Sequence, residues 1–391
     1  MSIATAIQNA QNKVAAAYTS CNNKGATMPA SANQNLSNLA STIDSIPTPL
    51  PVNQAIQTWV VTENDGATTY SRGRKVVGAN YTRVGDTEFQ NDETLVAALI
   101  PETVAYIGTN SFNGCTNLKY INLENVTSVS TWSFSNSGLY GELYMPNLTH
   151  IDWGSFENTK IKKVASLGSI TELKGTAPWN DATFKDCTEL REVVLPNNPI
   201  DLACAFWGCT NLTTINMENV TALRQWTFRG CVNLHFDELY MPNLTFLDDN
   251  CWAGGFNYPY IYKITSLGHI TELRTGSPAA RYGTFSQFTG LTEVNLHEGI
   301  TKIGAAAFLE CSSLPEITIP STVTRIEQWA FADCPLLKDM TCLATTPPDI
   351  SGGGDAGFSN LTNIYVPAAS VSAYQSASVW SNYASKIQAI P

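Results

Sequence analysis

The sequence predicts a β-rich repeat solenoid preceded by a short helical segment. The first observation is an aromatic residue that returns mostly every 22 to 24 residues, and the second is the phrase F-x-x-C-x-x-L that it usually opens. A period of about 20 to 50 residues is typical of stacked coils, each of which buries its apolar face only against its neighbours. The repeated positions are Phe89, Phe112, Phe134, Phe156, Phe184, Phe206, Phe228, Trp252, Phe285, Phe308, Phe331 and Phe358.

Each coil is expected to contain a short strand. Inward residues alternate with one outward residue around Asn295 and again around Thr318, which is the pattern of a half-buried strand. Prolines such as Pro146, Pro242 and Pro320 follow these segments, where a missing N–H costs least. The aromatic period therefore indicates about twelve coils of about 23 residues.

Four of these coils occur twice. Residues 112–195 align with residues 206–296, and the motif Leu-Tyr-Met-Pro-Asn-Leu occurs at 143–148 and again at 239–244. This pattern indicates duplication of a whole block of coils.

The phrase L-x-x-I-x-I-P-x-x-V-T-x-I-x-x-x-A-F-x-x-C resembles the BspA-like leucine-rich repeat, over about 89–361. The resemblance implies a leucine-rich-repeat solenoid at 86–346, with a C-terminal repeat and cap at 347–391. It also implies binding and adhesion rather than one chemistry, as in surface and phage proteins of gut bacteria. The Cys position departs from the pattern at Ser137, Thr159 and Phe288.

Residues 1–50 are expected to form two short helices that act as an anchor or oligomerisation segment. Their apolar residues recur at spacings of three and four, as in the seam of a coiled coil. One interpretation is a hairpin that caps the first coil, and the other is docking on another chain. Residues 51–85 are a predicted linker with possible short strands near Trp59 and Lys75. The seam residues proposed for docking are Ile3, Ile7, Val14, Leu36, Leu39 and Ile43.

Composition excludes several classes of function. The net charge is −11 and only 14% of residues are charged, which argues against nucleic-acid binding. No run approaches the roughly 18 apolar residues of a membrane span, so no membrane insertion is expected. Residues 1–21 lack a basic, apolar leader, which predicts synthesis in the cytoplasm without a secretion signal.

The cysteines are expected to be structural. Six of the ten occupy the same slot of successive coils, where a small, weakly polar side chain would fill the interior of the turn. No C-x-x-C pair exists, so a metal site is not expected, and folding in the cytoplasm would disfavour disulfides. The six are Cys115, Cys187, Cys209, Cys231, Cys311 and Cys334.

We expect no catalytic residues, no cofactor and no metal. The four histidines occupy non-equivalent positions of their coils, with no partner at ligand or triad spacing. Asp248 and Asp249 are adjacent, so we expect them to point to opposite faces or to lie in a solvated turn. The glycine run at 352–354 lacks the Lys and Ser/Thr of a phosphate loop.

Two rows of outward residues are candidates for ligand binding. Such side chains offer apolar planes with a polar edge at low entropy cost, which suits glycans or protein surfaces. The alternative is that they shield the sheet or fill a groove. One row contains Asn122, Tyr144, Asn216, Tyr240 and Asn295, and the other contains Trp132, Trp226 and Trp329.

These features favour a non-enzymatic binding protein, and above all a bacteriophage virion component with a structural or receptor-binding role. Residues 1–50 would contact other virion proteins or a second copy of the chain, and the solenoid would contact a cell-surface glycan or protein. The alternatives are an adhesin on a bacterial cell surface and a cytoplasmic protein-interaction scaffold.

Overall fold

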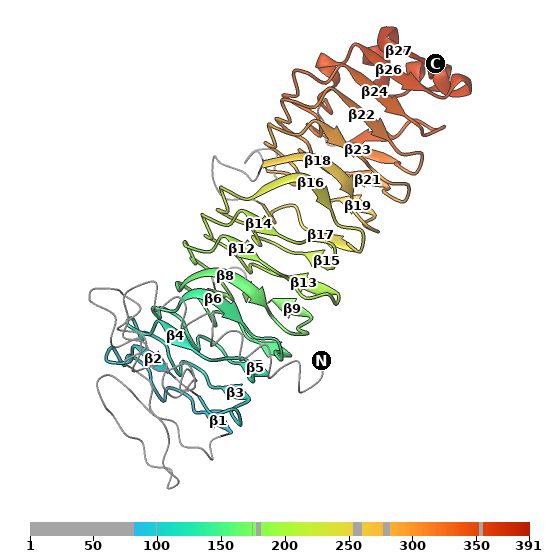
Figure 1. Cartoon of the computed structure of the whole chain (residues 1–391). Helices are drawn as coiled ribbons and strands as arrows, with labels where there is room; N and C mark the ends of the chain where they lie inside the picture. Colours follow the sequence, from blue (N-terminus) through green and yellow to red (C-terminus); the bar gives the residue numbers. More distant parts are fainter. Residues whose placement is uncertain are drawn as a thin grey trace, which may run out of the picture.

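The computed structural model shows an elongated parallel β-solenoid of about twelve turns (Figure 1). The structure describes residues 82–98, 100–173, 175–176, 181–252, 260–276, 282–351 and 355–391. The predicted anchor at 1–50 and the possible strands near Trp59 and Lys75 lie outside these residues. The leucine-rich-repeat solenoid predicted from the sequence is confirmed, whereas the proposed domain boundaries remain predictions.

Each turn contributes one strand to a first column of parallel strands, here called row A (Figure 1). Pairing is in register through β22, β24 and β26, which aligns Thr318 with Thr341 and Tyr365, whereas the longer pairs β6–β8 and β16–β18 contain register shifts. Row A consists of β2 (Ala97–Ala98), β4 (Tyr120–Ile121), β6 (Tyr140–Tyr144), β8 (Lys160–Ser166), β12 (Glu192–Val193), β14 (Thr214–Ile215), β16 (His235–Tyr240), β18 (Tyr260–Ser266), β20 (Glu293–Val294), β22 (Glu316–Ile319), β24 (Asp339–Cys342), β26 (Asn363–Val366) and β27 (Ile387–Ala389).

A second column, here called row B, runs beside the first (Figure 1). It consists of β1 (Arg83–Val84), β3 (Tyr106–Ile107), β5 (Ser128–Val129), β7 (His150–Ile151), β9 (Glu172–Leu173), β13 (Ile200–Leu202), β15 (Val220–Leu223), β17 (Phe246–Leu247), β19 (Glu272–Leu273), β21 (Lys302–Ile303), β23 (Arg325–Glu327) and β25 (Asp349–Ser351). A small antiparallel pair, β10 (Gly175–Thr176) and β11 (Asp181–Ala182), interrupts the repeat. Backbone groups of each strand pair with the coils before and after, so short strands suffice.

Turns with stacked aromatic rings close each coil. The repeat phenylalanines are buried, and the centroids of successive rings lie between 4.9 Å, for Phe89 on Phe112, and 6.3 Å, for Phe331 on Phe358. Trp252 takes a phenylalanine's place, with its ring 5.1 Å from that of Phe228. This ladder is the spine of one continuous apolar core, and it explains the aromatic period of the sequence.

The repeated cysteines are free, buried and hydrogen-bonded to the preceding coil. The Cys115 thiol donates to the Phe89 carbonyl at 2.9 Å, and the Cys334 thiol donates to the Phe308 carbonyl at 3.1 Å. Each thiol therefore fills space inside its turn and adds a hydrogen bond to a carbonyl of the preceding coil. This geometry confirms the structural interpretation of the cysteine slot.

Left-handed backbone flanks many of the repeat phenylalanines, two residues before and two residues after the ring. Gly208 has φ +77°, and a Cβ there would lie 2.1 Å from the Asp186 carboxylate. The tryptophans of the predicted second row occupy the position before the phenylalanine, with φ 52° at Trp132 and 60° at both Trp226 and Trp329. A side chain of that size is unusual in this backbone region.

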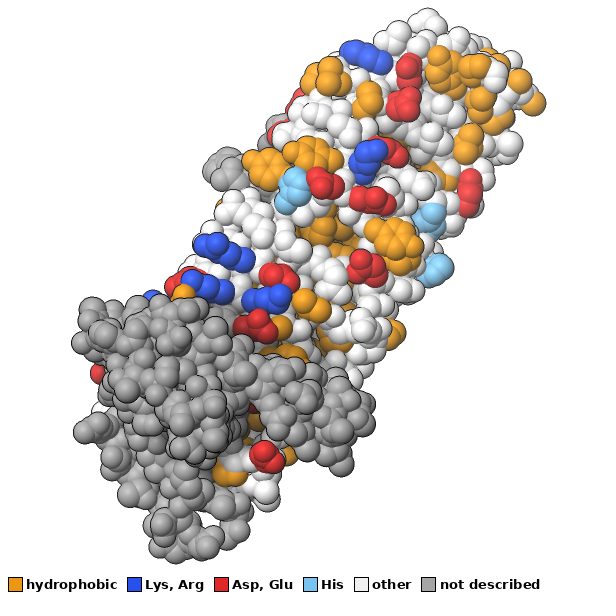
Figure 2. Space-filling model, in the orientation of Figure 1, with side chains coloured by type: hydrophobic (Ala, Val, Ile, Leu, Met, Phe, Trp, Pro, Cys, Tyr) orange, Lys and Arg blue, Asp and Glu red, His pale blue; other side chains and the backbone are white. Residues whose placement is uncertain are grey.

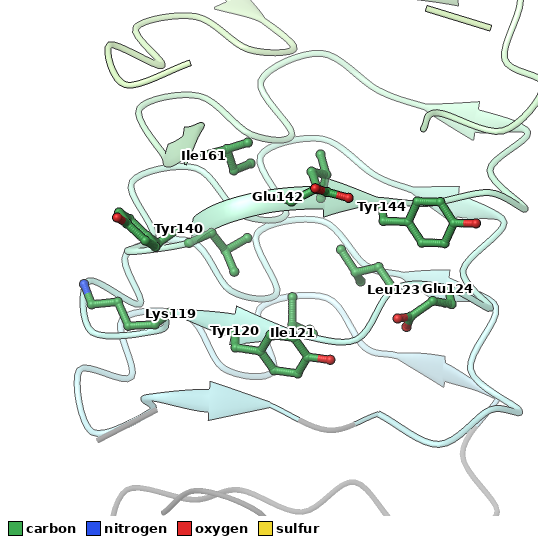
Figure 3. Close-up of a pocket in the computed structure, with 11 residues that line it drawn as sticks. Lys119, Tyr120, Ile121, Leu123, Glu124, Tyr140, Glu142, Tyr144 and Ile161 are labelled. Atoms are coloured by element: carbon green, nitrogen blue, oxygen red, sulfur yellow. The ribbon is translucent and has the colours of Figure 1, made fainter. Parts of the chain in front are cut away.

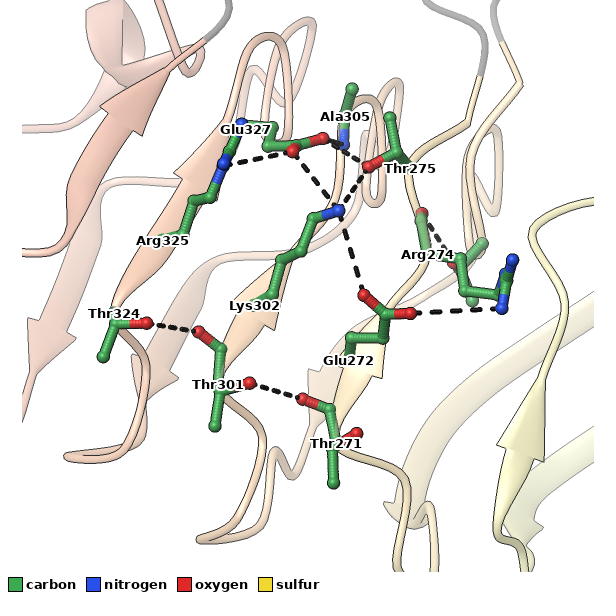
Figure 4. A network of polar contacts seen from close by, with 11 residues as sticks. Thr271, Glu272, Arg274, Thr275, Thr301, Lys302, Ala305, Thr324, Arg325 and Glu327 are labelled. Atoms are coloured by element: carbon green, nitrogen blue, oxygen red, sulfur yellow. Dashed lines mark hydrogen bonds and ion pairs between the residues drawn. The ribbon is translucent and has the colours of Figure 1, made fainter.

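Row B carries an ion and hydrogen-bond network around Glu327 on β23 (Figure 4). Its carboxylate accepts hydrogen bonds from the Thr275 hydroxyl and the Ala305 N–H, and it lies 3.3 Å from the Lys302 ammonium and 3.2 Å from Arg325 Nε. Its side chain is only 10% exposed. A buried carboxylate is stable here because four groups satisfy its charge.

The C-terminal segment covers the last coil. Three short 3-10 helices, η3 (Phe358–Asn360), η4 (Ala368–Ser370) and η5 (Trp380–Lys386), accompany helix α4 (Val371–Ser376). Tyr374 and Trp380 are buried, and their polar ends donate to the carbonyls of Ala344 and Pro348, each at 2.8 Å. These aromatic side chains close the apolar end of the core. In the described part of the chain, no helix has the length and apolar character to cross a membrane.

Candidate binding surface

Exposed tyrosines gather on row A. Two of them, Tyr144 and Tyr240, are the outward residues that the sequence pattern predicts, and they are 44% and 47% exposed. The others lie nearer the start of their strands, outside the inward–outward–inward triplet, so the sequence pattern did not indicate them. The exposed tyrosines of row A are Tyr120 on β4, Tyr140 and Tyr144 on β6, Tyr240 on β16, and Tyr260 and Tyr262 on β18.

A row of alternating charge crosses three strands of the first block. Glu142 on β6 is aligned with Lys163 on β8, which is aligned with Glu192 on β12. The Lys163 ammonium lies 2.8 Å from the Glu192 carboxylate. The row therefore has two carboxylates and one cation, and the cation forms its close ion pair with Glu192 rather than with Glu142.

The second block repeats this arrangement. Glu238 on β16 is aligned with Lys263 on β18, which is aligned with Glu293 on β20. The Lys263 ammonium lies 2.7 Å from the Glu293 carboxylate, and the other carboxylate, Glu238, accepts a hydrogen bond of 2.7 Å from the Thr265 hydroxyl. Tyr144 and Tyr240 follow two residues after the first carboxylate of their rows, aligned with Ser166 and Ser266 respectively.

A small groove of about 70 Å³ opens between β4 and β6 (Figure 3). Regular strand pairing stops here, since β4 pairs with β2 whereas β6 pairs with β8. Gly141, at φ 88°, marks a register shift in β6. A bulge of this kind bends a strand away from its neighbour, which accounts for the opening.

Aromatic rings and carboxylates line one end of this groove. Tyr120 points toward Glu124, while Glu142 and Tyr144 lie on the opposite strand (Figure 3). Burial raises the pKa of Tyr120, and the nearby Glu124 charge raises it further, so the phenol stays protonated and can donate a hydrogen bond. This end of the groove therefore combines apolar planes with hydrogen-bond acceptors.

Lys119 and Tyr140 lie at the other end of the groove (Figure 3), and Tyr140 is held from β8 by Lys162. The Lys162 ammonium donates to the Tyr140 hydroxyl at 2.5 Å and lies 4.4 Å from the centre of that ring. It also lies 3.9 Å from the Glu189 carboxylate. These contacts hold Tyr140 in place, so the ring is presented in a fixed orientation.

The asparagines of the predicted first row have structural partners. Asn122 forms two hydrogen bonds with Ile100 of the preceding coil. Its amide oxygen accepts from the Ile100 N–H and its amide nitrogen donates to the Ile100 carbonyl, both at 2.8 Å. Asn216 makes the same pair of bonds to Leu195, and Asn295 donates to the Thr265 carbonyl at 3.3 Å. These amides join coils together, which leaves the tyrosines as the row's main surface for a ligand.

The tryptophans of the second row lie at the turns, beside the phenylalanine ladder. Trp132 packs edge-on against Trp153 with ring centres 4.7 Å apart. Trp226 lies 5.5 Å from Trp207, and the Arg229 guanidinium lies 5.3 Å from the Trp226 ring centre. Trp329 is 42% exposed. The first two are thus engaged with neighbours, and Trp329 presents the most open ring of the three.

The carboxylate pair at 248–249 lies in a turn, one of the two alternatives that the sequence allowed, but both side chains are half-buried rather than fully solvated. Burial raises the pKa of Asp249 to about 7, and a hydrogen bond to Asp248 and the charge of Asp248 add to the effect. The two side chains therefore approach one another rather than pointing to opposite faces. Their residues follow β17, where the chain turns and the strand's alternation no longer applies.

No metal or catalytic constellation is evident in the part of the chain that the structure describes. Within it, no group of three or more His, Cys, Asp or Glu side chains could hold a metal ion. Two of the histidines, His150 and His235, pair with the aspartates two residues on, at 3.2 and 2.8 Å. The glycine run at 352–354 lies outside the described residues. Figure 2 shows cationic, anionic and apolar side chains interspersed on the visible face of the solenoid.

A stack of parallel coils with an aromatic and acidic outer surface defines a leucine-rich-repeat solenoid of the binding class. The chain belongs to the family of BspA-type leucine-rich repeat proteins: the model of the BspA type leucine rich repeat region (6 copies) matches residues 75–181, 179–276 and 280–385. Solenoids of this kind generally mediate interactions with other proteins, members of this family are commonly bacterial surface proteins, and no catalytic family is indicated. A search of curated proteins returns no match.

Several solved structures of bacterial leucine-rich-repeat proteins are similar to this chain. A leucine-rich repeat protein from Bacteroides ovatus shares 18% identity, with 85% of this chain and 98% of that chain covered and a TM-score of 0.48. A leucine rich cell surface protein from Faecalibacterium prausnitzii shares 17% identity over 85% and 93%, with a TM-score of 0.30. An internalin from Listeria monocytogenes shares 13% sequence identity, with 76% of this chain and 86% of that chain covered and a TM-score of 0.28. All three TM-scores lie below 0.5, so these likenesses add nothing to the functional argument.

Proposed function

We propose that this protein is a non-enzymatic adhesion protein that binds a cell surface through the exposed tyrosines of row A. The observation that carries the proposal is the recurrence of an exposed tyrosine beside a carboxylate at equivalent points of both blocks, at Tyr144 and Tyr240. Tyrosine supplies a large, rigid contact area with a polar tip at low entropy cost, and it is enriched among residues that dominate binding energy.

The surroundings support a binding role for these rings. Glu142 and Glu238 provide acceptors beside them, and the groove between β4 and β6 gives a partner a concave point of entry. Large exposed aromatic rings gathered over neighbouring strands are unusual on a surface that contacts only water. Row A is therefore the proposed interface with the partner, a glycan or protein of the target cell.

The protein's place in a larger assembly is also a proposal. We propose a bacteriophage virion component that docks through residues 1–50, where apolar residues recur at coiled-coil spacing. The alternative places the same solenoid on a bacterial cell surface. Purified phage particles and washed cell envelopes from the producing culture should be probed with an antibody to the solenoid. Signal in the particles supports the virion proposal. Signal in the cell envelopes and none in the particles overturns it.

The binding surface is tested with the double variant Tyr144→Ala/Tyr240→Ala. Loss of both rings should weaken binding to intact target cells by about 2 kcal/mol or more, roughly thirtyfold, because few aromatic anchors carry most of an interface's energy. Tyr282→Ala is the matched control, since this tyrosine is also exposed but lies outside row A. A thermal melt reports folding. Binding equal to that of the unaltered protein would remove row A as the site, and a collapsed melt would identify these tyrosines as packing residues.

A further inference from the structure

We propose that the duplicated block forms two equivalent subsites for a single linear polysaccharide of neutral or amino-sugar units. The inference rests on the proposed function, because it names the ligand of the same surface. The first subsite consists of Glu124, Glu142 and Tyr144, and the second consists of Glu218, Glu238 and Tyr240. All six side chains are exposed on row A or on the turn that follows its strands.

The two subsites match in backbone as well as in sequence. Glu124 lies in the turn after β4, and its carbonyl accepts a hydrogen bond of 2.8 Å from the Asn147 amide of the next coil. Glu218 lies in the corresponding turn after β14, where the Asn243 amide makes the same 2.8 Å bond. Each turn is thereby fixed to the coil that carries its tyrosine, which holds the three groups of a subsite together.

The equivalence in charge extends to the neighbouring strands. Lys163 and Lys263 are aligned with the carboxylates Glu142 and Glu238, and each forms a close ion pair with a glutamate on its far side. These two lysines are thus already paired with carboxylates, and Lys119, at the far end of the groove, donates to the Thr116 carbonyl at 3.4 Å. At each subsite an acidic polymer would meet two exposed carboxylates, while Lys163 and Lys263 are already paired, so charge disfavours it.

The chemistry of the subsites selects a ligand rich in donors. Ionised carboxylates only accept hydrogen bonds, so two glutamates per subsite require hydroxyl, amide or ammonium groups from the partner. The tyrosine ring adds an apolar plane, and its hydroxyl both donates and accepts. A sugar ring supplies the complement of each group, since it carries hydroxyls at its edge and C–H bonds on its face.

The spacing of the subsites selects a polymer. β6 and β16 are separated along row A by β8, β12 and β14, which is four strand steps. At about 4.8 Å a step, the two tyrosines lie roughly 19 Å apart along the axis. Because the strands are parallel, the subsites are related by a shift along the solenoid. A chain with a repeating unit can present the same groups to both subsites.

The test compares ligand length on an immobilised array. Neutral and amino-sugar oligosaccharides (gluco-, manno- and chito-series), from disaccharides to oligomers longer than about 20 Å, are set beside hyaluronan and polylysine. Full-length protein should bind the long oligomers of one series at least about tenfold more tightly than the disaccharide, because the second contact becomes intramolecular. Tyr144→Ala and Tyr240→Ala should each abolish this length dependence while retaining weak binding. The double variant should lose the length dependence and the weak binding as well, and Tyr282→Ala should bind as the unaltered protein does.

Several outcomes overturn the polysaccharide assignment. These are equal affinity for short and long oligomers, complete loss in either single variant, tyrosine-dependent binding to polylysine or hyaluronan only, and no tyrosine-dependent binding on the array. If any of these occurs while the double variant still fails to bind cells, row A remains the binding surface and its partner is a protein. If the double variant binds cells normally, the proposed function itself fails.

Discussion

Glu327 makes the stability of the solenoid sensitive to acid. Burial acts to raise the pKa of this carboxyl, but the hydrogen bond from Thr275 and the charge of Lys302 outweigh it and hold the pKa below its ordinary value. A carboxyl with a depressed pKa in the folded state stabilises it above the ordinary value, near 4.5. That contribution is lost as the pH falls through the lower, folded-state pKa.

Replacing Glu327 with Gln should therefore cost about 1.5–3 kcal/mol of unfolding free energy at pH 7, because hydrogen bonds to a charged group are lost. The cost should shrink in acid, where the native carboxyl is itself protonated. Urea unfolding at several pH values measures the loss of unfolding free energy at pH 7 and its decrease in acid. Glu316→Gln, at an exposed position, should change little at any pH. A Glu327→Gln variant with the same small effect at pH 7 would contradict the role assigned to the network.

Asp249 should produce the opposite dependence on pH. Its pKa is raised to about 7 in the folded state, by burial first and then by Asp248, from an ordinary value of 3.8. Its stabilising contribution is complete below that ordinary value and is lost as the pH rises through about 7. Asp249→Asn should raise the unfolding free energy at pH 8 by about 1–2 kcal/mol, a figure reduced for partial exposure, and leave it nearly unchanged at pH 4. Equal effects at both pH values would refute this assignment.

At the scale of the element, the turn beside each phenylalanine sets the stability of a coil. Trp329 has φ 60° and a largely open ring, whereas Trp226 has the same φ but packs on Trp207 and Arg229. Asparagine tolerates this backbone better than tryptophan. Trp329→Asn should raise the unfolding free energy by about 0.5–1 kcal/mol, and Trp226→Asn should lower it because packing is lost. Thermal melts of the two variants measure these changes in stability. A comparable loss of stability in both variants would contradict the claim that the left-handed backbone at Trp329 is strained.

The sequence predicted the parts of the fold that repeat. Period and alternation placed the phenylalanine ladder, the cysteine slot and the outward positions of Tyr144 and Tyr240, because one physical requirement recurs in each coil. The groove between β4 and β6 could not be predicted in this way, since it depends on the register shift at Gly141. The roles of Asn122 and Asn216 could not be predicted either, because alternation shows that a side chain points outward and not that its amide bonds the preceding coil.

At the scale of the whole molecule, residues 1–50 are predicted to drive association. Deleting them should leave a folded solenoid that no longer oligomerises or docks, because the deletion removes the apolar seam predicted to make the contact. Light scattering of the full chain, the deletion and the variant Ile7→Asp/Leu39→Asp measures association, and far-UV circular dichroism confirms folding. The substitution should behave like the deletion. A full-length chain that is monomeric both alone and with purified phage particles would contradict the prediction.

Oxidative footprinting of the full chain bound to its target cells tests the central claim most directly, because it maps the contact surface residue by residue. The account predicts that Tyr144 and Tyr240 become protected together, while Tyr282 and Trp329 are labelled as in the free protein. Protection confined to row B or to the turns that carry the phenylalanine ladder, with Tyr144 and Tyr240 labelled as in the free protein, would contradict the claim that this solenoid binds through row A.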